Sequence, residues 1–337
     1  MNARLRSAAG AMLLATLVAL TPAAPVRAAQ AIKITIPTYT VADGAYFAAL
    51  QKGYFAAEGL DVEFVFTGGG VATPAMISGT VDGSASGSAS LSAILRGAAL
   101  RIVLVFTASP AYQVWAQPDI HTLADLKGKP VGVNTRGDTF EIAMRLALQN
   151  AGLSPDSVGY TPVGFGSNVS AAFDSGALAA VIVSPGLVIE MKEQGALKNA
   201  HMISDFFGKV HMPWNSFVLS EKLLYGNPAL AKKMLRAIIK GARYIKAFRS
   251  QTVGFSKFYQ KETFSQKGSE YDYDELMQEI TRDWTVDDAL IQSDLTVRAG
   301  LLSIPKEQIP PIAKVYDFSL VRTINAELDK SHWKPTP

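Results

Sequence analysis

Short β-rich runs alternate with helical patterns along most of the chain, and this alternation restricts the fold more than any other feature. The first run covers residues 32–37, where Lys33 and Thr35 alternate with isoleucines, and a helical pattern follows from about residue 42 to 57. Further β-rich runs come at residues 62–66, 102–106, 131–133 and 181–183. Strands separated by helices form sheets that the helices cover. The sequence therefore predicts an α/β protein.

The N-terminus has the layout of a secretory signal. Arg4 and Arg6 precede an uncharged apolar run over residues 8–20, and small residues around Ala28 follow. Because a membrane-spanning helix needs about 20 apolar residues, we interpret residues 1–28 as a cleaved signal peptide, with a retained anchor helix as the alternative. Cleavage would remove three arginines and no acid, so the formal net charge of +3 would fall to zero. We therefore expect no nucleic-acid partner.

The 337 residues include no cysteine, so a disulfide framework, thiol chemistry and a lipid-accepting cysteine after the signal are excluded. The four histidines are scattered along the sequence, without the spacing of a metal site. We expect no metal and no cofactor. These features and the signal together predict a freely diffusing periplasmic protein.

The length that remains after the signal, roughly 309 residues, suits two domains. Pro118 and the pair Pro213-Trp214 interrupt the pattern, so we place crossings between two lobes near Gln117 and near Trp214. The first lobe is then expected at residues 29–117, the second at 118–213, and a return to the first lobe with C-terminal helices at 214–337. Helical patterns in this last part cover about 228–249, 273–284 and 287–302.

Four short motifs occur in a fixed order. They are Gly53–Glu63 (GYFAAEGLDVE), Ser78–Gly83 (SGTVDG), Leu123–Lys129 with DLKGK inside it, and Ala171–Gly176 (AAFDSG). In this order they resemble the solute-binding proteins of ABC importers, of the nitrate/sulfonate/taurine and thiamine-precursor type. The resemblance covers nearly the whole chain after the signal, through about Arg249.

This resemblance implies a type II periplasmic-binding-protein fold, with two α/β lobes, a ligand cleft and a hinge. It also implies a small-molecule ligand, an ABC permease of the inner membrane as partner, and no catalysis, and we expect a monomer. In such proteins the ligand touches loops at the carboxyl ends of strands and the amino ends of helices. Unpaired N–H groups at helix N-termini are ready donors for an anion.

The chain departs from the sulfonate-binding pattern at two places. The run Ser86-Gly87-Ser88 stands where those proteins usually carry an acid, and Ala179-Ala180 and Ser184-Pro185 stand where they carry Asp-Ala and an aromatic before the proline. A sulfonate ligand therefore does not follow from the resemblance.

Candidate ligand contacts in the first lobe follow its β-rich runs. Tyr39 and Thr40 lie after the first run, where the ring of Tyr39 would form a cleft wall or only pack. Gly69 and Gly70 would let backbone N–H groups approach a ligand, or would form a plain tight turn.

Three small residues and one dipeptide complete this set. Ser86, Gly87 and Ser88 would supply small donors, or would start a helix packed on the sheet. Trp214 and Asn215 fall at the second crossing, where stacking and an amide contact are both plausible, although a tryptophan is more often part of the core.

Candidates in the second lobe follow the run at 131–133. Arg136 with Gly137, Asp138 and Thr139 opens the next helix, and a guanidinium beside its N-terminus would favour an anion such as a carboxylate or sulfonate. In the alternative, Arg136 pairs at the surface with Asp138 or Glu141. Asp138 and Glu141 also have the spacing of a capping box.

Two further candidates in the second lobe are Phe165 and Ser184. Phe165 lies within Gly164-Phe165-Gly166, a cleft loop or an ordinary turn, and Ser184 precedes Pro185 after the last run.

Two other functions remain open. Thiamine-pyrimidine synthases are enzymes on the same fold, but they carry a cysteine-rich motif that this chain lacks. A ligand sensor for a membrane receptor would need the same clamp as an importer.

Overall fold

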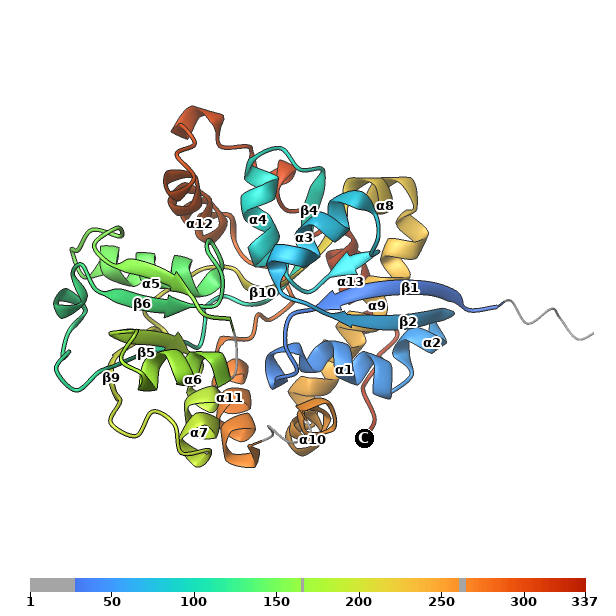
Figure 1. The fold of residues 1–337 in the computed structure, drawn as a ribbon. Coiled ribbons are helices and arrows are strands. Elements are labelled where there is room, and N and C mark those ends of the chain that lie inside the picture. The colour runs from blue at the N-terminus through green and yellow to red at the C-terminus, as the bar shows by residue number, and fades with distance from the viewer. Residues whose placement is uncertain (1–27, 165–166, 261–264) are drawn as a thin grey trace, which may run out of the picture.

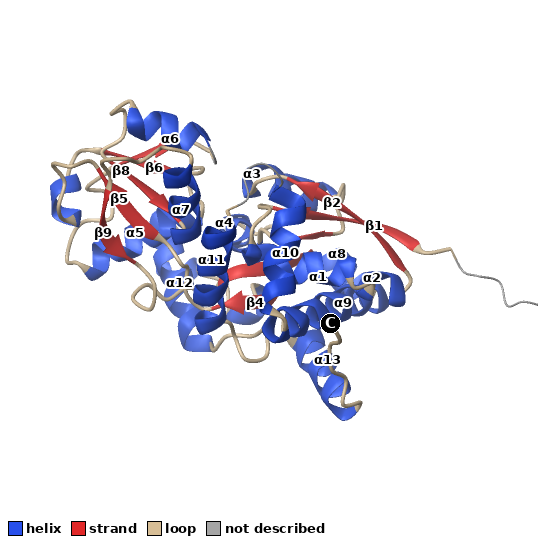
Figure 2. Ribbon diagram, turned by 90° about the horizontal axis from the view of Figure 1, so that it is seen from below, coloured by secondary structure: helices blue, strands red, loops and turns tan. Residues whose placement is uncertain are grey.

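The computed structural model describes residues 28–164, 167–260 and 265–337, which form two lobes, each around a five-stranded sheet (Figure 1). The strand order is β2-β1-β3-β10-β4 in the first lobe and β7-β6-β8-β5-β9 in the second. Helices cover the sheets, as the alternating sequence pattern predicts (Figure 2). Residues 1–27 of the expected signal peptide lie outside the described residues.

The first sheet is mainly built from the N-terminal third of the chain. Its strands are β1 (Gln30–Ile36), β2 (Leu60–Phe66), β3 (Gly83–Ser84), β4 (Leu100–Thr107) and β10 (Trp214–Ser220). Strand β1 pairs in parallel with β2 and β3, whereas β10 runs antiparallel between β3 and β4. The helices of this lobe are α1 (Gly44–Gln51), α2 (Tyr54–Ala57), α3 (Gly69–Ser78), α4 (Gly87–Leu95), α8 (Glu221–Gly226), α9 (Pro228–Ala247), α10 (Arg249–Gln260), α11 (Gln266–Glu279), α12 (Asp288–Leu301) and α13 (Ser319–Lys330).

The second sheet repeats this plan. Its strands are β5 (Gln113–Ala116), β6 (Pro130–Val133), β7 (Gly159–Pro162), β8 (Ala180–Val183) and β9 (His201–Asp205). Strand β6 pairs in parallel with β7 and β8, and β5 runs antiparallel between β8 and β9. Its helices are α5 (Thr139–Asn150), α6 (Ser167–Asp174) and α7 (Pro185–Glu193).

The chain passes between the lobes twice, and each passage leads into the antiparallel strand of a sheet. The first passage covers residues 108–112, between β4 and β5, and the second covers 206–213, between β9 and β10. Because β5 belongs to the second sheet, the first passage ends before the expected position near Gln117. The second passage ends before Trp214, the first residue of β10.

Capping residues mark the ends of the long helices, and Asp138 is the cap that the sequence predicts. The Asp138 carboxylate accepts a hydrogen bond from the Glu141 N–H at 3.0 Å and opens α5, and Asn227 accepts one from the Leu230 N–H at 3.2 Å and opens α9. Gly152 follows α5 in the left-handed region, at φ +73°.

The helix expected at 273–284 lies instead at α11, which ends at Glu279. The reason is a contact with a distant strand, because Ile280 forms a β-bridge with Thr107 at the end of β4. Trp284, which would have closed the helix, is buried in the core of the first lobe.

Helices α1 and α9 touch through their backbones at Gly241. A Cβ atom on Gly241 would lie 2.0 Å from the Ala45 carbonyl oxygen and 3.0 Å from the Ala49 nitrogen. Since both atoms belong to the backbone of α1, a rotamer change cannot relieve the overlap, and the two helices would have to move apart.

We predict that Gly241→Ala lowers the free energy of unfolding by about 1 to 3 kcal/mol, because overpacking forces backbone shifts. Urea unfolding of the two proteins measures the difference. The control is Gly254→Ala in α10, where a Cβ atom would meet nothing within 4 Å, so the gain in helix propensity should leave stability equal or raised by up to about 1 kcal/mol. Equal midpoints for the wild type and Gly241→Ala would contradict the packing described for α1 and α9.

Candidate ligand-binding site

A cavity of about 420 Å³ lies between the two lobes. Its wall comes from the loops after β1 and β6, from the N-terminal ends of α4, α5 and α7, from the start of β10 and from α11. Most of the ligand contacts expected from the sequence line it, namely Tyr39, Thr40, Ser86, Ser88, Asp138, Thr139, Ser184, Trp214 and Asn215. The carboxyl ends of strands and the amino ends of helices thus meet here, as in other open α/β sheets.

The remaining expected contacts lie elsewhere. Gly70, Arg136 and Gly137 line a second, neighbouring cavity of about 910 Å³. Gly69 is the first residue of α3. Gly87 lets α4 approach β10, because a Cβ atom there would lie 2.8 Å from the Ser216 carbonyl oxygen. Phe165 is outside the described residues.

Aromatic rings form much of the wall of the 420 Å³ cavity. Tyr39 stacks on Phe66 with ring centroids 4.0 Å apart, and Tyr112 stacks on Phe140 at 4.3 Å. Trp214 meets the edge of Tyr112 at 5.3 Å and packs against the cores of both lobes. Rings in these positions can stack on a flat ligand. The sequence analysis missed Tyr112 and Phe140.

Asn215 has an unusual backbone conformation at the start of β10. Its φ of +46° is in the left-handed region, which asparagine tolerates better than most residues. Its side-chain amide donates to the Ala42 carbonyl, in the 3-10 turn Val41–Asp43 of the loop that precedes α1. The amide nitrogen therefore ties β10 to this loop, and this contact holds the neighbouring Trp214 ring at the cavity.

Asp43 is an acid of the cavity wall that the sequence analysis did not select. Its side chain is only 1% exposed, and its Oδ2 accepts hydrogen bonds from the Thr38 hydroxyl at 2.5 Å and the Thr38 N–H at 3.2 Å. Burial raises the pKa of Asp43 to about 7, and the bonds from Thr38 offset only part of this effect.

Asp138 occupies the N-terminus of α5. Its two oxygens accept from the N–H groups of Glu141 at 3.0 Å and Thr135 at 2.8 Å. Burial nevertheless raises the pKa of Asp138 to about 6. The residue is therefore both the predicted helix cap and part of the cavity wall.

Asp272 of α11 reaches across to the second lobe and covers the N-terminus of α7. Its Oδ1 accepts from the Gly186 N–H at 2.7 Å, and its Oδ2 lies 3.4 Å from the Ser184 hydroxyl. A Cβ atom on Gly186 would lie 2.5 Å from the Gly268 carbonyl oxygen, so the two helices touch through glycines. Burial raises the pKa of Asp272 to about 7.

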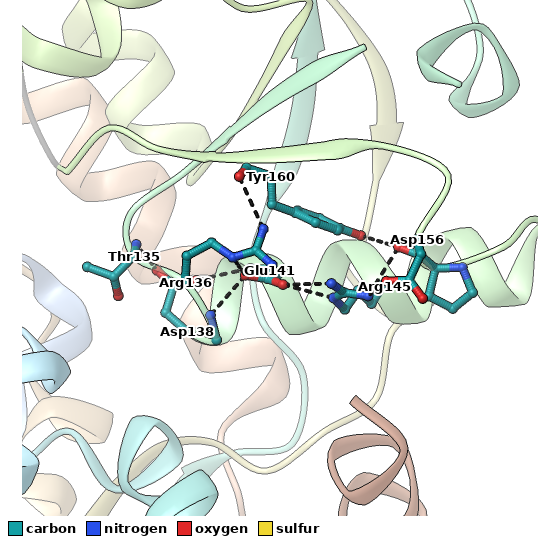
Figure 3. A network of polar contacts seen from close by, with 9 residues as sticks. Thr135, Arg136, Asp138, Glu141, Arg145, Asp156 and Tyr160 are labelled. Carbon is teal, nitrogen blue, oxygen red and sulfur yellow. Dashed lines mark hydrogen bonds and ion pairs between the residues drawn. The ribbon is translucent and has the colours of Figure 1, made fainter. Parts of the chain in front are cut away.

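Arg136 does not reach the 420 Å³ cavity, because its guanidinium has partners on the second lobe (Figure 3). Its Nε lies 3.4 Å from Glu141 Oε2, and its Nη1 donates to the Tyr160 carbonyl at 3.1 Å. Glu141 also pairs with Arg145 at 2.9 Å. The Arg136 side chain is 54% exposed. This is the surface pairing weighed as the alternative, so its position does not support a role in directing an anion into the cleft.

A buried ion pair fixes one wall of the cavity from behind. Arg298 of α12 pairs with Asp294 at 2.9 Å and donates to the hydroxyl of Ser88 at 2.9 Å and to its carbonyl at 3.0 Å. The spacing of Asp294 and Arg298 by four residues was the only sequence signal for this support. Nothing in the sequence links it to Ser88.

The chain is similar to known proteins. Residues 43–248 match the profile of the NMT1/THI5-like family. The chain belongs to that family. A protein of Brucella abortus (strain 2308) that carries a provisional binding-protein name is 30% identical over 267 residues, which cover 76% of this chain and 82% of the relative. The riboflavin-binding protein RibY of Chloroflexus aurantiacus is 25% identical over 58% of this chain and 56% of its own length.

Solved structures confirm the fold expected for a member of the NMT1/THI5-like family. The alkanesulfonate-binding protein SsuA of Xanthomonas axonopodis pv. citri, bound to MOPS, has a TM-score of 0.67 with 17% identity, over 89% of this chain and 99% of its own. The periplasmic nitrate-binding protein NrtA of Synechocystis PCC 6803 has a TM-score of 0.70 with 14% identity, over 89% of each chain. The chain thus has the periplasmic-binding-protein fold.

Two features of the described residues bear on other functions. No helix among them is long and apolar enough to cross a membrane. Within residues 28–164, 167–260 and 265–337, no group of three or more histidine or acidic side chains could hold a metal ion.

We predict that the protein without its solute is more stable at pH 5 than at pH 8. The folded-state pKa values of Asp43, Asp138 and Asp272, about 6 to 7, exceed the ordinary value of 3.8, so the folded chain binds these protons more tightly than the unfolded chain. The resulting stabilisation is complete below pH values of about 4 and is lost as the pH rises to about 7, by up to about 1.4 kcal/mol per pH unit for each group.

Urea midpoints measured between pH 5 and pH 8 check this prediction, and Asp43→Asn should flatten the profile because it removes one of the three groups. A midpoint that stays constant or rises over this interval would show that these carboxyls are not held in a protonated form.

Proposed function

We propose that this chain is the periplasmic solute-binding component of an ABC-type importer. It encloses a small organic solute between its lobes and delivers it to a permease of the inner membrane. The observation that carries this proposal is the 420 Å³ cavity, because both lobes supply its wall. The signal-like N-terminus, the family and the periplasmic binding proteins of the same fold support the location and the transport role.

The binding residues that we propose come from both lobes. Tyr39, Ser86 and Trp214 belong to the first lobe, and Thr139 and Ser184 to the second. A solute can contact both sets of residues at once only when the lobes are close together. Binding therefore favours the closed arrangement, and the permease can distinguish the loaded protein from the empty one by its shape.

We also propose that the protein catalyses no reaction. The absence of cysteine supports this proposal against the thiamine-pyrimidine synthases, which carry a cysteine-rich motif. A sensor would use the same cavity but would pass the closed shape to a receptor. Stimulation of a reconstituted permease's ATPase by the loaded protein would distinguish import from sensing.

We predict that the solute closes the lobes. Native mass spectrometry of freshly purified protein should show a bound molecule and give its mass, and small-angle scattering should show a smaller radius of gyration with this solute than after its removal. The protein should remain monomeric in both states. An unchanged scattering profile with solute bound would contradict the hinge.

Tyr39→Ala tests whether the solute binds in this cavity. The ring is 42% exposed and stacks on Phe66, so its loss should change stability by less than about 1 kcal/mol. Affinity for the co-purified solute should fall at least tenfold, because one wall of the cavity is missing. Unchanged affinity would place the solute elsewhere.

We predict that the co-purified solute is recovered chemically unchanged after prolonged incubation with the pure protein. Mass spectrometry of the released solute decides this. A product formed by the homogeneous wild-type protein would favour the enzyme alternative.

A further inference from the structure

This inference rests on the solute-binding function proposed above and concerns the charges in the cavity wall. We infer that the cavity takes an organic cation with a flat ring. The acids that line the cavity are Asp43, Asp138, Glu190 and Asp272, and none of the described lining residues is a lysine, arginine or histidine. These carboxylates would repel an anion, and no basic side chain of the described wall would offset the repulsion. A cation would supply the positive charge that the carboxylates lack.

The helix N-termini lead to the same class of solute. In an empty clamp, the N–H groups at a helix start are free to bind an anion. Here Asp138 accepts from the Glu141 N–H in the first turn of α5, and Asp272 accepts from the Gly186 N–H at the start of α7. Carboxylates of the protein itself therefore occupy two of the positions that an anionic solute would use.

Asp43 has an oxygen that is free for the solute. Its Oδ2 accepts two hydrogen bonds from Thr38, but Oδ1 has no hydrogen-bond partner among the described residues. Among the described residues no basic side chain pairs with this carboxyl, and burial raises its pKa. A protonated amine of the solute can donate to Oδ1 and neutralise the charge.

Unpartnered hydroxyls in the same wall are a second, independent indication of a polar ligand. Ser86 and Ser216 line the cavity, their residues are 7% and 0% exposed, and neither hydroxyl oxygen has a hydrogen-bond partner within the described parts of the chain. Buried hydroxyls are nearly always bonded in folded proteins. These unpartnered polar atoms beside the cavity suit a polar solute better than an apolar one.

The aromatic wall accounts for the flat ring. The exposed face of Tyr39 and the group formed by Tyr112, Phe140 and Trp214 border the same cavity as the acids. Rings beside carboxylates suit a cation, since the ring faces and the carboxylates both attract positive charge.

Three probes with one ring system and different charges test the inference. Tryptamine is a cation at pH 7.5, tryptophol is neutral and indole-3-acetate is an anion. Isothermal titration calorimetry of the full mature protein, freed of solute, should show that tryptamine binds at least tenfold tighter than tryptophol and that indole-3-acetate does not bind. Asp43→Asn should lower the ratio of the affinities for tryptamine and tryptophol at least tenfold.

The control is Asp119→Asn, which removes the same charge from an exposed position outside the cavity and should leave the preference unchanged. If circular dichroism shows that Asp43→Asn does not fold, Glu190→Gln on α7 replaces it, with the same expected direction.

Tighter binding of indole-3-acetate, equal binding of all three probes, or no binding of tryptamine would overturn the inference. Binding of the anion would point to the N-terminus of α4, which has no side-chain cap. None of these results would refute the solute-binding function, because the native mass spectrum and the scattering experiment test that function without any assumption about charge.

Discussion

The two connections between the lobes are hydrogen-bonded to each other, and this pairing joins the two halves of the cavity wall. The Met212 N–H donates to the Ala108 carbonyl at 3.0 Å, and the Ser109 hydroxyl donates to the Val210 carbonyl at 2.8 Å. The lobes are thus joined by two hydrogen-bonded segments, which can bend while each sheet stays intact. Tyr112 and Trp214 lie at the ends of the two connections and line the cavity, so a bend of the hinge changes the cavity directly.

Local sequence signals predicted the elements whose causes are local. The cap Asp138 located α5, and the helical pattern at about 228–249 located α9. The rule that ligands meet strand ends and helix starts selected Ser86, Ser88 and Ser184. Strands β5 and β10 were not predicted, because each pairs only with strands distant in the sequence. Each runs antiparallel in a sheet whose other strand pairs are parallel, and a local sequence pattern does not indicate such pairing.

The acids of the cavity show the same limit at the level of single residues. Asp43 stands in the sequence as an ordinary acid at a helix start, and only the fold buries it beside Thr38. Asp272 has no distinguishing signal in the sequence, but the glycine contact of α7 with α11 brings it onto the Gly186 N–H. The burial of Asp43 and the contact of Asp272 with Gly186 both depend on the folded arrangement of the chain. No spacing of residues in the sequence indicates either of them.

The fold and the charge preference of such a clamp have separate physical origins. The sheets and their crossings place helix N-termini around the cleft, and these ends favour an anion in any chain with this topology. The charge preference then depends on which ends are filled by side chains of the protein itself. In this chain α5 and α7 are filled by Asp138 and Asp272, and the arginine that might have restored an anion site, Arg136, is held by Glu141 outside the cavity. Two proteins with the same topology can therefore select solutes of opposite charge through a few side chains on helices such as α11.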